Sequence, residues 1–226
     1  MLMRVLMMAA ACGLALAADE TKPDAGRRKV RLLEEQGLDG WRCYLADHLV
    51  GLEDVWSLRE GVLVCRGEPM GYLYTRQAYR DFRLRFQWRW AGDGKPGNSG
   101  VLMRINGEPR PLPRCLEVQL QSGNAGDIFG FHGMKLSGDP ARLRHVPDHK
   151  LGGDLTGVSR AAGGEKPPGE WNTCEILVAG PQIEVWINDR LVNQAHDVEI
   201  ASGPIALQSE GGEIHFRGLE LTVPEE

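Results

Sequence analysis

The chain has 226 residues, of which 26 are basic and 31 acidic, so its formal net charge is −5 at pH 7. This mildly acidic balance disfavours nucleic acid and anionic membrane surfaces as partners. The length fits one large β domain or two small ones.

The chain begins with a short basic stretch and an apolar run. Residues 1–4 carry the positive charge, residues 5–16 are apolar or small, and Ala15-Leu16-Ala17 has the A-x-A pattern of a cleavage site. The pattern predicts a signal peptide over residues 1–17, cleaved near Ala17, and hence an exported protein, periplasmic or extracellular. This run is too short to span a bilayer and no later stretch approaches that length, so we expect no membrane span.

After such a cleavage four cysteines remain, Cys43, Cys65, Cys115 and Cys174. An even number in an exported protein is compatible with disulfides in any of three pairings, and equally with buried free thiols. Residues 18–36 are charged and lack an apolar period, which indicates a linker before a single domain over residues 37–226.

From residue 37 onward the sequence predicts an all-β fold. Residues 56–65 form a predicted hairpin that turns at Glu60-Gly61. Residues 81–90 alternate apolar and polar side chains, which is typical of a strand with one buried face. The alternation changes parity at Gly218, which indicates a β-bulge. Many short strands between glycine-rich turns predict a β-sandwich or jelly roll.

Residues 122–170 interrupt this rhythm, because they are rich in glycine and keep no strand period. We expect a long excursion without regular structure, either a wall or lid over a site or a poorly ordered insertion. His145, Asp148 and His149 have a spacing that could suit a metal ion. No second anchoring element accompanies them, so we interpret them as solvated loop residues.

The run Cys115-Leu116-Glu117-Val118-Gln119-Leu120-Gln121 is the most informative segment. On a strand, its leucines and valine point to one face, and Glu117, Gln119 and Gln121 point to the other. Such a row of fixed donors and acceptors suits a polyhydroxylated ligand. The alternative is an ordinary polar outer face of a sandwich.

Several short motifs occur in the order found in one family, and they resemble the 3-keto-disaccharide hydrolase family over about residues 37–224. The motifs are Gly40-Trp41, Trp56 with Gly61-Val62-Leu63, Asp81-Phe82 through Trp88-Arg89, Asn98-Ser99-Gly100-Val101 with Arg104, Glu117-Val118-Gln119, Glu170-Trp171-Asn172, Ile187-Asn188, Gly203-Pro204-Ile205-Ala206-Leu207-Gln208 and Phe216-Arg217.

The resemblance implies a concanavalin A-like jelly roll of two curved antiparallel sheets that acts on 3-keto-glycosides. A retaining glycosidase needs two carboxyl groups about 5 Å apart, and the Glu117 row supplies only one. A 3-keto group offers another route, because it acidifies the C2 hydrogen and permits β-elimination of the glycosidic oxygen, followed by addition of water. This route needs a base, a group that stabilises the enolate oxygen and a proton donor.

As a hypothesis we assign these roles to particular residues. Glu117 either holds the sugar hydroxyls or acts as the base, and Gln119 binds a hydroxyl. Arg104 stabilises the enolate, because a guanidinium stays charged and offers several donors. His132 or Lys135 is the candidate proton shuttle; the alternative for both is a structural loop position.

Gln121, Trp171 and Gln208 are further candidates for substrate binding. Trp171 is either a platform for a sugar ring or a core tryptophan. The predicted partner is an oligosaccharide or glycoside substrate, with no cofactor and no metal ion at the site, although the implied fold is compatible with a structural calcium ion. The sequence leaves the oligomeric state open.

A second class of function fits the same polar row. A non-catalytic, lectin-like carbohydrate-binding module would also present donors and acceptors on a concave strand. We favour the enzyme, because a binding face has little need of the proton-transfer groups expected in residues 122–170. A third interpretation, a structural module of a cell-surface assembly, lacks a supporting repeat.

Overall fold

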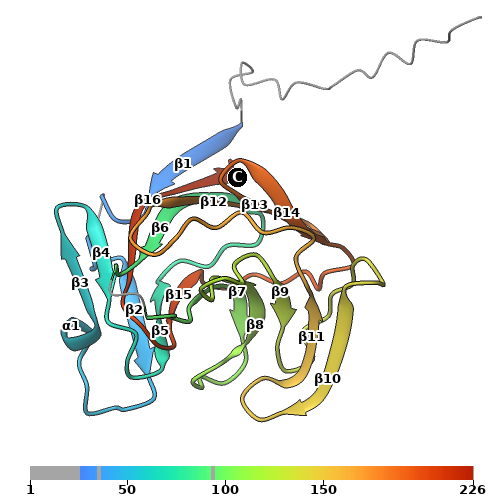
Figure 1. The fold of residues 1–226 in the computed structure, drawn as a ribbon, viewed down its shortest axis with the longest axis horizontal. Coiled ribbons are helices and arrows are strands. Elements are labelled where there is room, and N and C mark those ends of the chain that lie inside the picture. The colour runs from blue at the N-terminus through green and yellow to red at the C-terminus, as the bar shows by residue number, and fades with distance from the viewer. Residues whose placement is uncertain (1–25, 35–36, 93–94, 226) are drawn as a thin grey trace, which may run out of the picture.

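The computed structural model describes residues 26–34, 37–92 and 95–225. The signal peptide predicted for residues 1–17 lies outside these residues. The described residues form two eight-stranded antiparallel sheets that lie face to face, as Figure 1 shows. The all-β prediction is therefore confirmed.

One sheet, called here the back sheet, has the strand order β14-β13-β12-β6-β16-β4-β3, with β1 paired to β16. Its strands are β1 (Arg27–Arg31), β3 (Trp56–Arg59), β4 (Val62–Cys65), β6 (Phe82–Trp90), β12 (Asn172–Ala179), β13 (Gln182–Ile187), β14 (Arg190–Ala195) and β16 (Ile214–Pro224).

The other sheet, called here the front sheet, has the order β10-β11-β9-β8-β7-β15-β5-β2 and forms an arc below the back sheet in Figure 1. Its strands are β2 (Trp41–Leu45), β5 (Gly71–Thr75), β7 (Gly100–Asn106), β8 (Arg114–Gln119), β9 (Ile128–Gly130), β10 (Leu143–His149), β11 (Gly153–Val158) and β15 (Ala206–Ser209). A short helix, α1 (Leu52–Val55), precedes β3.

The main core lies between the two sheets. On β6 the residues alternate between buried and more exposed positions along the strand, as the sequence predicts. On β8 the apolar side chains Leu116 and Val118 are fully buried in the same core, and Leu120 follows them. The polar side chains of β8 must therefore point to the outward face of the front sheet.

Two predicted turns are confirmed. β3 pairs with β4 across Glu60 and Gly61, which both have positive φ, as a tight hairpin turn requires. In β16 the pairing with β6 shifts between Arg217 and Glu220, and Gly218 has φ +61°. The change of parity in the sequence thus marks a real bulge.

Two segments differ from the sequence-based expectation. The described part of the predicted linker contains β1, whose residues Arg27–Arg31 extend the back sheet by pairing with β16. Its charged side chains are tolerated because an edge strand faces solvent. Residues 122–170, expected to lack regular structure, contribute β9, β10 and β11. Their strands are short or, in β10, exposed along the whole length, so they lack the alternation that marks a half-buried strand.

Two further observations concern the chain as a whole. Among the described residues, no helix has the length and apolar character needed to cross a membrane. The four described cysteines are all unpaired, and Cys65, Cys115 and Cys174 are buried. Of the two alternatives left by the sequence, the structure thus has free thiols.

Candidate functional site

The outward face of the front sheet carries a groove with a cavity volume of about 350 Å³. The lining residues are Leu112, Glu117, Gln119, Phe129, Phe131, Arg144, Val146, His149, Leu151, Leu155, Gln208 and Glu210. A larger hollow of about 600 Å³, lined by Arg28, Asp81 and Glu225 among others, contains none of the predicted site residues. We therefore place the candidate site in the smaller groove.

The strand register arranges the groove in rows that run across the sheet. Glu117 is opposite Leu102 on one side and Phe129 on the other, which defines a central row. On one side of this row, Gln119 is opposite Gly100. On the other side, Val146 is opposite Leu155. Glu117 thus lies between a polar end and an apolar end of the groove.

Glu117 is the most unusual side chain of the groove. It is only 2% exposed, and within the part of the chain that the structure describes its Oε1 has no hydrogen-bond partner. Gly100 makes this position available, because a Cβ atom at residue 100 would overlap Glu117 Oε1. A buried, unpartnered carboxyl group is costly, so it needs an explanation outside folding.

A second carboxyl group, that of Glu210, also lines the groove. Burial raises the pKa of Glu117 well above its usual value, and the nearby Glu210 raises it further. Burial also raises the pKa of Glu210, to about 6. Of the two carboxyl groups, Glu117 therefore keeps its proton to the higher pH, and Glu210 ionises first.

The sequence analysis does not assign Glu210 to the site, although the sequence contains a pattern that could have indicated it. Gln208 lies on β15 and is 1% exposed, with a buried Oε1 that has no partner among the described residues. Ala206, Gln208 and Glu210 share one parity, so Glu210 continues the groove-facing side of β15 just beyond its end. The sequence-based assignment of Gln208 to the cleft agrees with its position.

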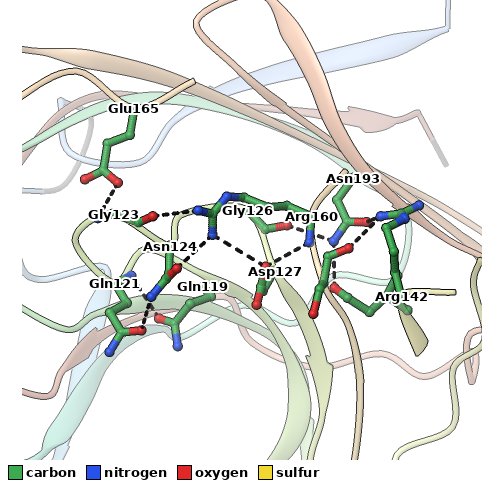
Figure 2. A network of polar contacts seen from close by, with 12 residues as sticks. Gln119, Gln121, Gly123, Asn124, Gly126, Asp127, Arg142, Arg160, Glu165 and Asn193 are labelled. Carbon is green, nitrogen blue, oxygen red and sulfur yellow. Dashed lines mark hydrogen bonds and ion pairs between the residues drawn. The ribbon is translucent and has the colours of Figure 1, made fainter. Parts of the chain in front are cut away.

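Gln119 lines the groove, whereas Gln121 does not. Gln119 Oε1 accepts hydrogen bonds from the backbone N–H groups of Leu120 and Gln121, both at 3.0 Å. Its amide NH₂ group is the part that remains for a ligand. Gln121 lies beyond the end of β8, where its Oε1 accepts a hydrogen bond from Asn124 Nδ2 at 3.0 Å. It belongs to the polar cluster of Figure 2 rather than to the groove lining.

That cluster ties the turn after β8 to the segment after β11. Figure 2 shows Arg160 extending between Asn124 and Asp127. Its guanidinium donates to Asn124 Oδ1 at 3.1 Å and to the carbonyl of Gly123 at 2.6 Å, and its backbone N–H donates to Asp127 Oδ1 at 2.8 Å. Asp127 is thereby held in place at the polar end of the groove.

Asp127 in turn orients Arg144, which lines the groove. Arg144 Nη2 donates to Asp127 Oδ2 at 3.2 Å, and its guanidinium carbon lies 5.1 Å from the centre of the Phe129 ring. Because Phe129 is opposite Glu117, these contacts bring a fixed cation to the central row.

Arg104, the predicted enolate stabiliser, has a different position. Its side chain is fully buried, and its guanidinium donates to the carbonyls of Glu199 and Gly180, both at 2.7 Å, and to that of Arg80 at 3.2 Å. Arg104 has φ +53° at a register shift of β7, so its side chain leaves the groove-facing row. The catalytic assignment is therefore corrected: Arg104 connects the backbone segments at Arg80, Gly180 and Glu199 by hydrogen bonds.

Neither predicted proton shuttle lines the groove. His132 Nε2 is 2.9 Å from the carbonyl of Leu112, and its Nδ1 is 3.4 Å from Arg110 Nη1, so both ring nitrogens already have a partner. Lys135 is exposed, and its charge is near Glu199. The histidine that does line the groove is His149, whose Nδ1 accepts a hydrogen bond from Gly152 N–H at 3.0 Å. Among the described residues, no three His, Cys, Asp or Glu side chains gather as a metal site.

Trp171 directly precedes β12 of the back sheet and does not line the groove. Two guanidinium groups lie over its ring, with Arg217 Cζ at 4.0 Å and Arg89 Cζ at 4.6 Å from the ring centre. Both arginines come from strands of the back sheet, β16 and β6. The structure therefore brings Glu117, Gln119 and Gln208 together, and it separates Arg104, Gln121, His132, Lys135 and Trp171 from them.

The fold is a concanavalin A-like jelly-roll sandwich whose front sheet carries a groove with two carboxyl groups. The chain belongs to the 3-keto-alpha-glucoside-1,2-lyase-like domain family, whose model matches residues 29–222. The resemblance seen in the sequence motifs is thus confirmed. No protein of curated function matches the sequence.

Solved structures with the same fold include enzymes and binding modules. A protein from Parabacteroides distasonis ATCC 8503 inferred to be a glycosyl hydrolase has 19% identity and a TM-score of 0.60, covering 85% of this chain and 92% of that one. The carbohydrate-binding module CBM66 from Bacillus subtilis has 13% identity and a TM-score of 0.57, covering 80% and 94%. The Bacillus licheniformis β-glucanase has 9% identity and a TM-score of 0.53, covering 90% and 100%. At these identities the comparisons establish the fold.

Proposed function

We propose that the protein is an exported enzyme that cleaves 3-keto-glycosides by elimination and then hydration. The observation that carries the proposal is the pair Glu117 and Glu210, two carboxyl groups in one groove, of which burial raises the pKa of Glu117 more than that of Glu210. Family membership supports the substrate class, since the family description names a 1,2-lyase of 3-keto-alpha-glucosides. The predicted signal peptide supports export.

The chemistry requires the removal of a proton from C2 and the departure of the oxygen on C1. Removal of the C2 proton gives an enolate whose charge rests on the C3 oxygen. The electron pair then forms the C1–C2 double bond as the C1–O bond breaks, and the leaving oxygen takes up a proton. Addition of water across the double bond releases the 3-keto sugar.

The protonation states assign the roles of the two carboxyl groups. Glu210, with a pKa raised to about 6, is ionised at neutral pH and acts as the base at C2. Glu117, in which burial favours the neutral form more strongly, is the proton donor to the leaving oxygen. This differs from the sequence-based hypothesis, in which Glu117 is the base or holds hydroxyls. Arg144 replaces Arg104 as the cation that can stabilise the enolate oxygen.

The second carboxyl group also weakens the case against ordinary glycoside hydrolysis. The sequence disfavours hydrolysis because the Glu117 row holds one carboxyl group, but Glu210 supplies another from the strand end after β15. Family membership is what favours the keto route, and the unoxidised parent sugar is therefore the necessary control substrate. A lectin-like module remains the second candidate, because CBM66 shares the fold.

The proposal is tested with the protein lacking residues 1–17, incubated with 3-keto-trehalose or with trehalose. Release of 3-keto-glucose from the oxidised sugar alone is the expected result. Release of glucose from trehalose would indicate ordinary hydrolysis instead. Binding of either sugar without product would favour the lectin-like module.

A further inference from the structure

The two ends of the groove differ in polarity. Gln119, Gln208 and Glu210 form the polar end. The other end is formed by Leu112, Phe131, Val146, Leu151 and Leu155, together with His149, whose Nδ1 is already engaged with Gly152 N–H. Phe131 stacks on Phe129 of the central row, with ring centres 5.9 Å apart and an angle of 20° between the rings. A sugar with hydroxyl groups all around it fits the polar end better than the apolar end.

The apolar end also exposes large side chains to solvent. Val146 is 38% exposed and Leu151 is 42% exposed, whereas the Phe131 and Leu155 side chains next to them are buried. Val146 and Leu151 both come from the β10–β11 hairpin, which forms the outer wall of the groove. An apolar ligand group placed between this hairpin and Phe131 would remove these side chains from water, which is favourable in proportion to the area covered.

The position of the acid and the base orients the substrate. The base, Glu210, lies at the polar end, so the keto sugar that it deprotonates belongs there. The proton donor, Glu117, lies in the central row, so the leaving oxygen is beside it. The remainder of the leaving group must then extend away from the sugar, over Phe131 and towards the hairpin.

We propose that the apolar end is the subsite for the leaving group, and that the preferred substrates are 3-keto-glucosides of apolar alcohols rather than 3-keto-disaccharides. This inference rests on the proposed function. In the cleavage step the C2 proton passes to Glu210, the electron pair of the C1–O bond stays on the leaving oxygen, and Glu117 protonates that oxygen. The products are the free apolar alcohol and the unsaturated keto sugar, to which water then adds.

The experiment compares benzyl 3-keto-α-glucoside with 3-keto-trehalose and methyl 3-keto-α-glucoside. The benzyl and methyl groups leave as simple alcohols, so a difference between them reports contact with the leaving group rather than its acidity. We expect kcat/KM for the benzyl substrate to exceed both other values by about tenfold or more.

Two variants locate the effect in the groove. Leu151→Asn is expected to lower the ratio of kcat/KM for the benzyl substrate to that for 3-keto-trehalose by about tenfold. Leu191→Asn is the matched control, because Leu191 is also 42% exposed but lies on β14, outside the groove lining. It is expected to leave the ratio unchanged.

The outcomes separate this inference from the proposed function. Turnover of 3-keto-trehalose at least as efficient as that of the benzyl substrate, or a ratio unaffected by Leu151→Asn, overturns the inference and leaves the function standing. If no keto substrate is turned over, the proposed function fails. In that case, calorimetric binding of benzyl α-glucoside that Leu151→Asn weakens and Leu191→Asn does not would still support the apolar subsite, and no binding would overturn it.

Discussion

Arg104 and Glu117 are buried ionisable residues on neighbouring strands of the same sheet, β7 and β8, yet their surroundings are opposite. The Arg104 guanidinium donates to three backbone carbonyls and lies 3.6 Å from the Asp81 carboxylate. The Glu117 carboxyl has a buried oxygen with no partner among the described residues. Both residues have predicted roles at the site from the sequence alone, and only one of them lies there.

The difference shows how a buried ionisable group that stabilises the fold can be distinguished from one that serves a function. Folding selects for buried polar groups that are fully paired, because an unpaired group costs stability. Arg104 meets that requirement, because its guanidinium is already bonded to carbonyl groups inside the protein and lies outside the groove. Glu117 does not meet it and lies opposite Phe129 in a groove, so we propose a ligand as its partner. Substitutions and a pH titration can test this contrast.

Glu117→Gln should nearly abolish turnover while leaving the fold intact. Glutamine keeps the shape of the neutral carboxyl group but cannot release its proton, so we expect kcat to fall by about 10³-fold. The free energy of unfolding should change by less than about 1 kcal/mol, because glutamine is neutral and burial favours the neutral form of Glu117. Steady-state kinetics and chemical denaturation measure the two effects, and full activity of the variant would remove Glu117 from the mechanism.

Arg104→Met should show the converse pattern. The substitution leaves the carbonyls of Arg80, Gly180 and Glu199 without their donor, so we expect a loss of about 3–5 kcal/mol in the free energy of unfolding. Urea denaturation measures it. The fraction that remains folded should turn over substrate at close to the normal rate. A stable but inactive variant would restore the catalytic role of Arg104.

Gly100→Ala should impair the site through the position of Glu117. The new Cβ atom would overlap Glu117 Oε1, so the carboxyl group must move. We expect kcat/KM to fall by about 10²-fold, since a displacement of about 1 Å has that effect on a catalytic group. Gly163→Ala is the matched control, because a Cβ atom at residue 163 would have no neighbouring atom within 4 Å among the described residues. Equal activity of both variants would contradict the role of Gly100.

The pH dependence should reveal the ionisation of Glu210. Because its pKa is raised to about 6 in the folded state, kcat/KM should rise with pH as the base ionises near pH 6. Stability has the opposite sign: the folded state holds the proton more tightly, so the stabilising contribution is complete below the usual pKa of a glutamate and is lost as pH rises through about 6. Glu210→Gln should lower kcat/KM at every pH because the base is lost, and it should make the fall in stability shallower without removing it, since the pKa of Glu117 is also raised. Activity assays and denaturation at several pH values measure the two effects.

Trp171→Leu should have the smallest effect on catalysis. Arg89 and Arg217 lie over the Trp171 ring and come from the back sheet, so we expect a stability loss of about 1–2 kcal/mol and a change in kcat/KM of less than about twofold. Kinetics with 3-keto-trehalose test this. A large rise in KM would instead indicate that the tryptophan binds sugar, as the sequence-based alternative holds.

Much of the fold could be predicted from the sequence, because period-two alternation follows directly from strand geometry. The structure contains three features predicted from local patterns: the long strand β6, the hairpin at Glu60-Gly61 and the bulge at Gly218. β1 and β10 could not be found this way, since edge strands with exposed side chains on both faces have no alternation to detect.

The site was predictable only where it follows a single strand. Glu117 and Gln119 share a face of β8 by parity alone. Glu210 comes from another part of the chain, and its proximity to Glu117 depends on the order β8-β7-β15, which no local pattern reveals. Arg104 was misplaced for a related reason, because its positive φ at a bulge changes the direction of the side chain.

The proton-donor role of Glu117 is tested most directly by measuring the protonation state of its carboxyl group in the folded protein. Carbon-13 NMR of protein labelled at the glutamate carboxyl carbons, titrated with and without Glu117→Gln, measures it. We predict that one carboxyl resonance keeps the chemical shift of a protonated group at neutral pH and is missing from the spectrum of the variant. If every glutamate carboxyl group is instead ionised at neutral pH, Glu117 is not the proton donor and the proposed mechanism is wrong.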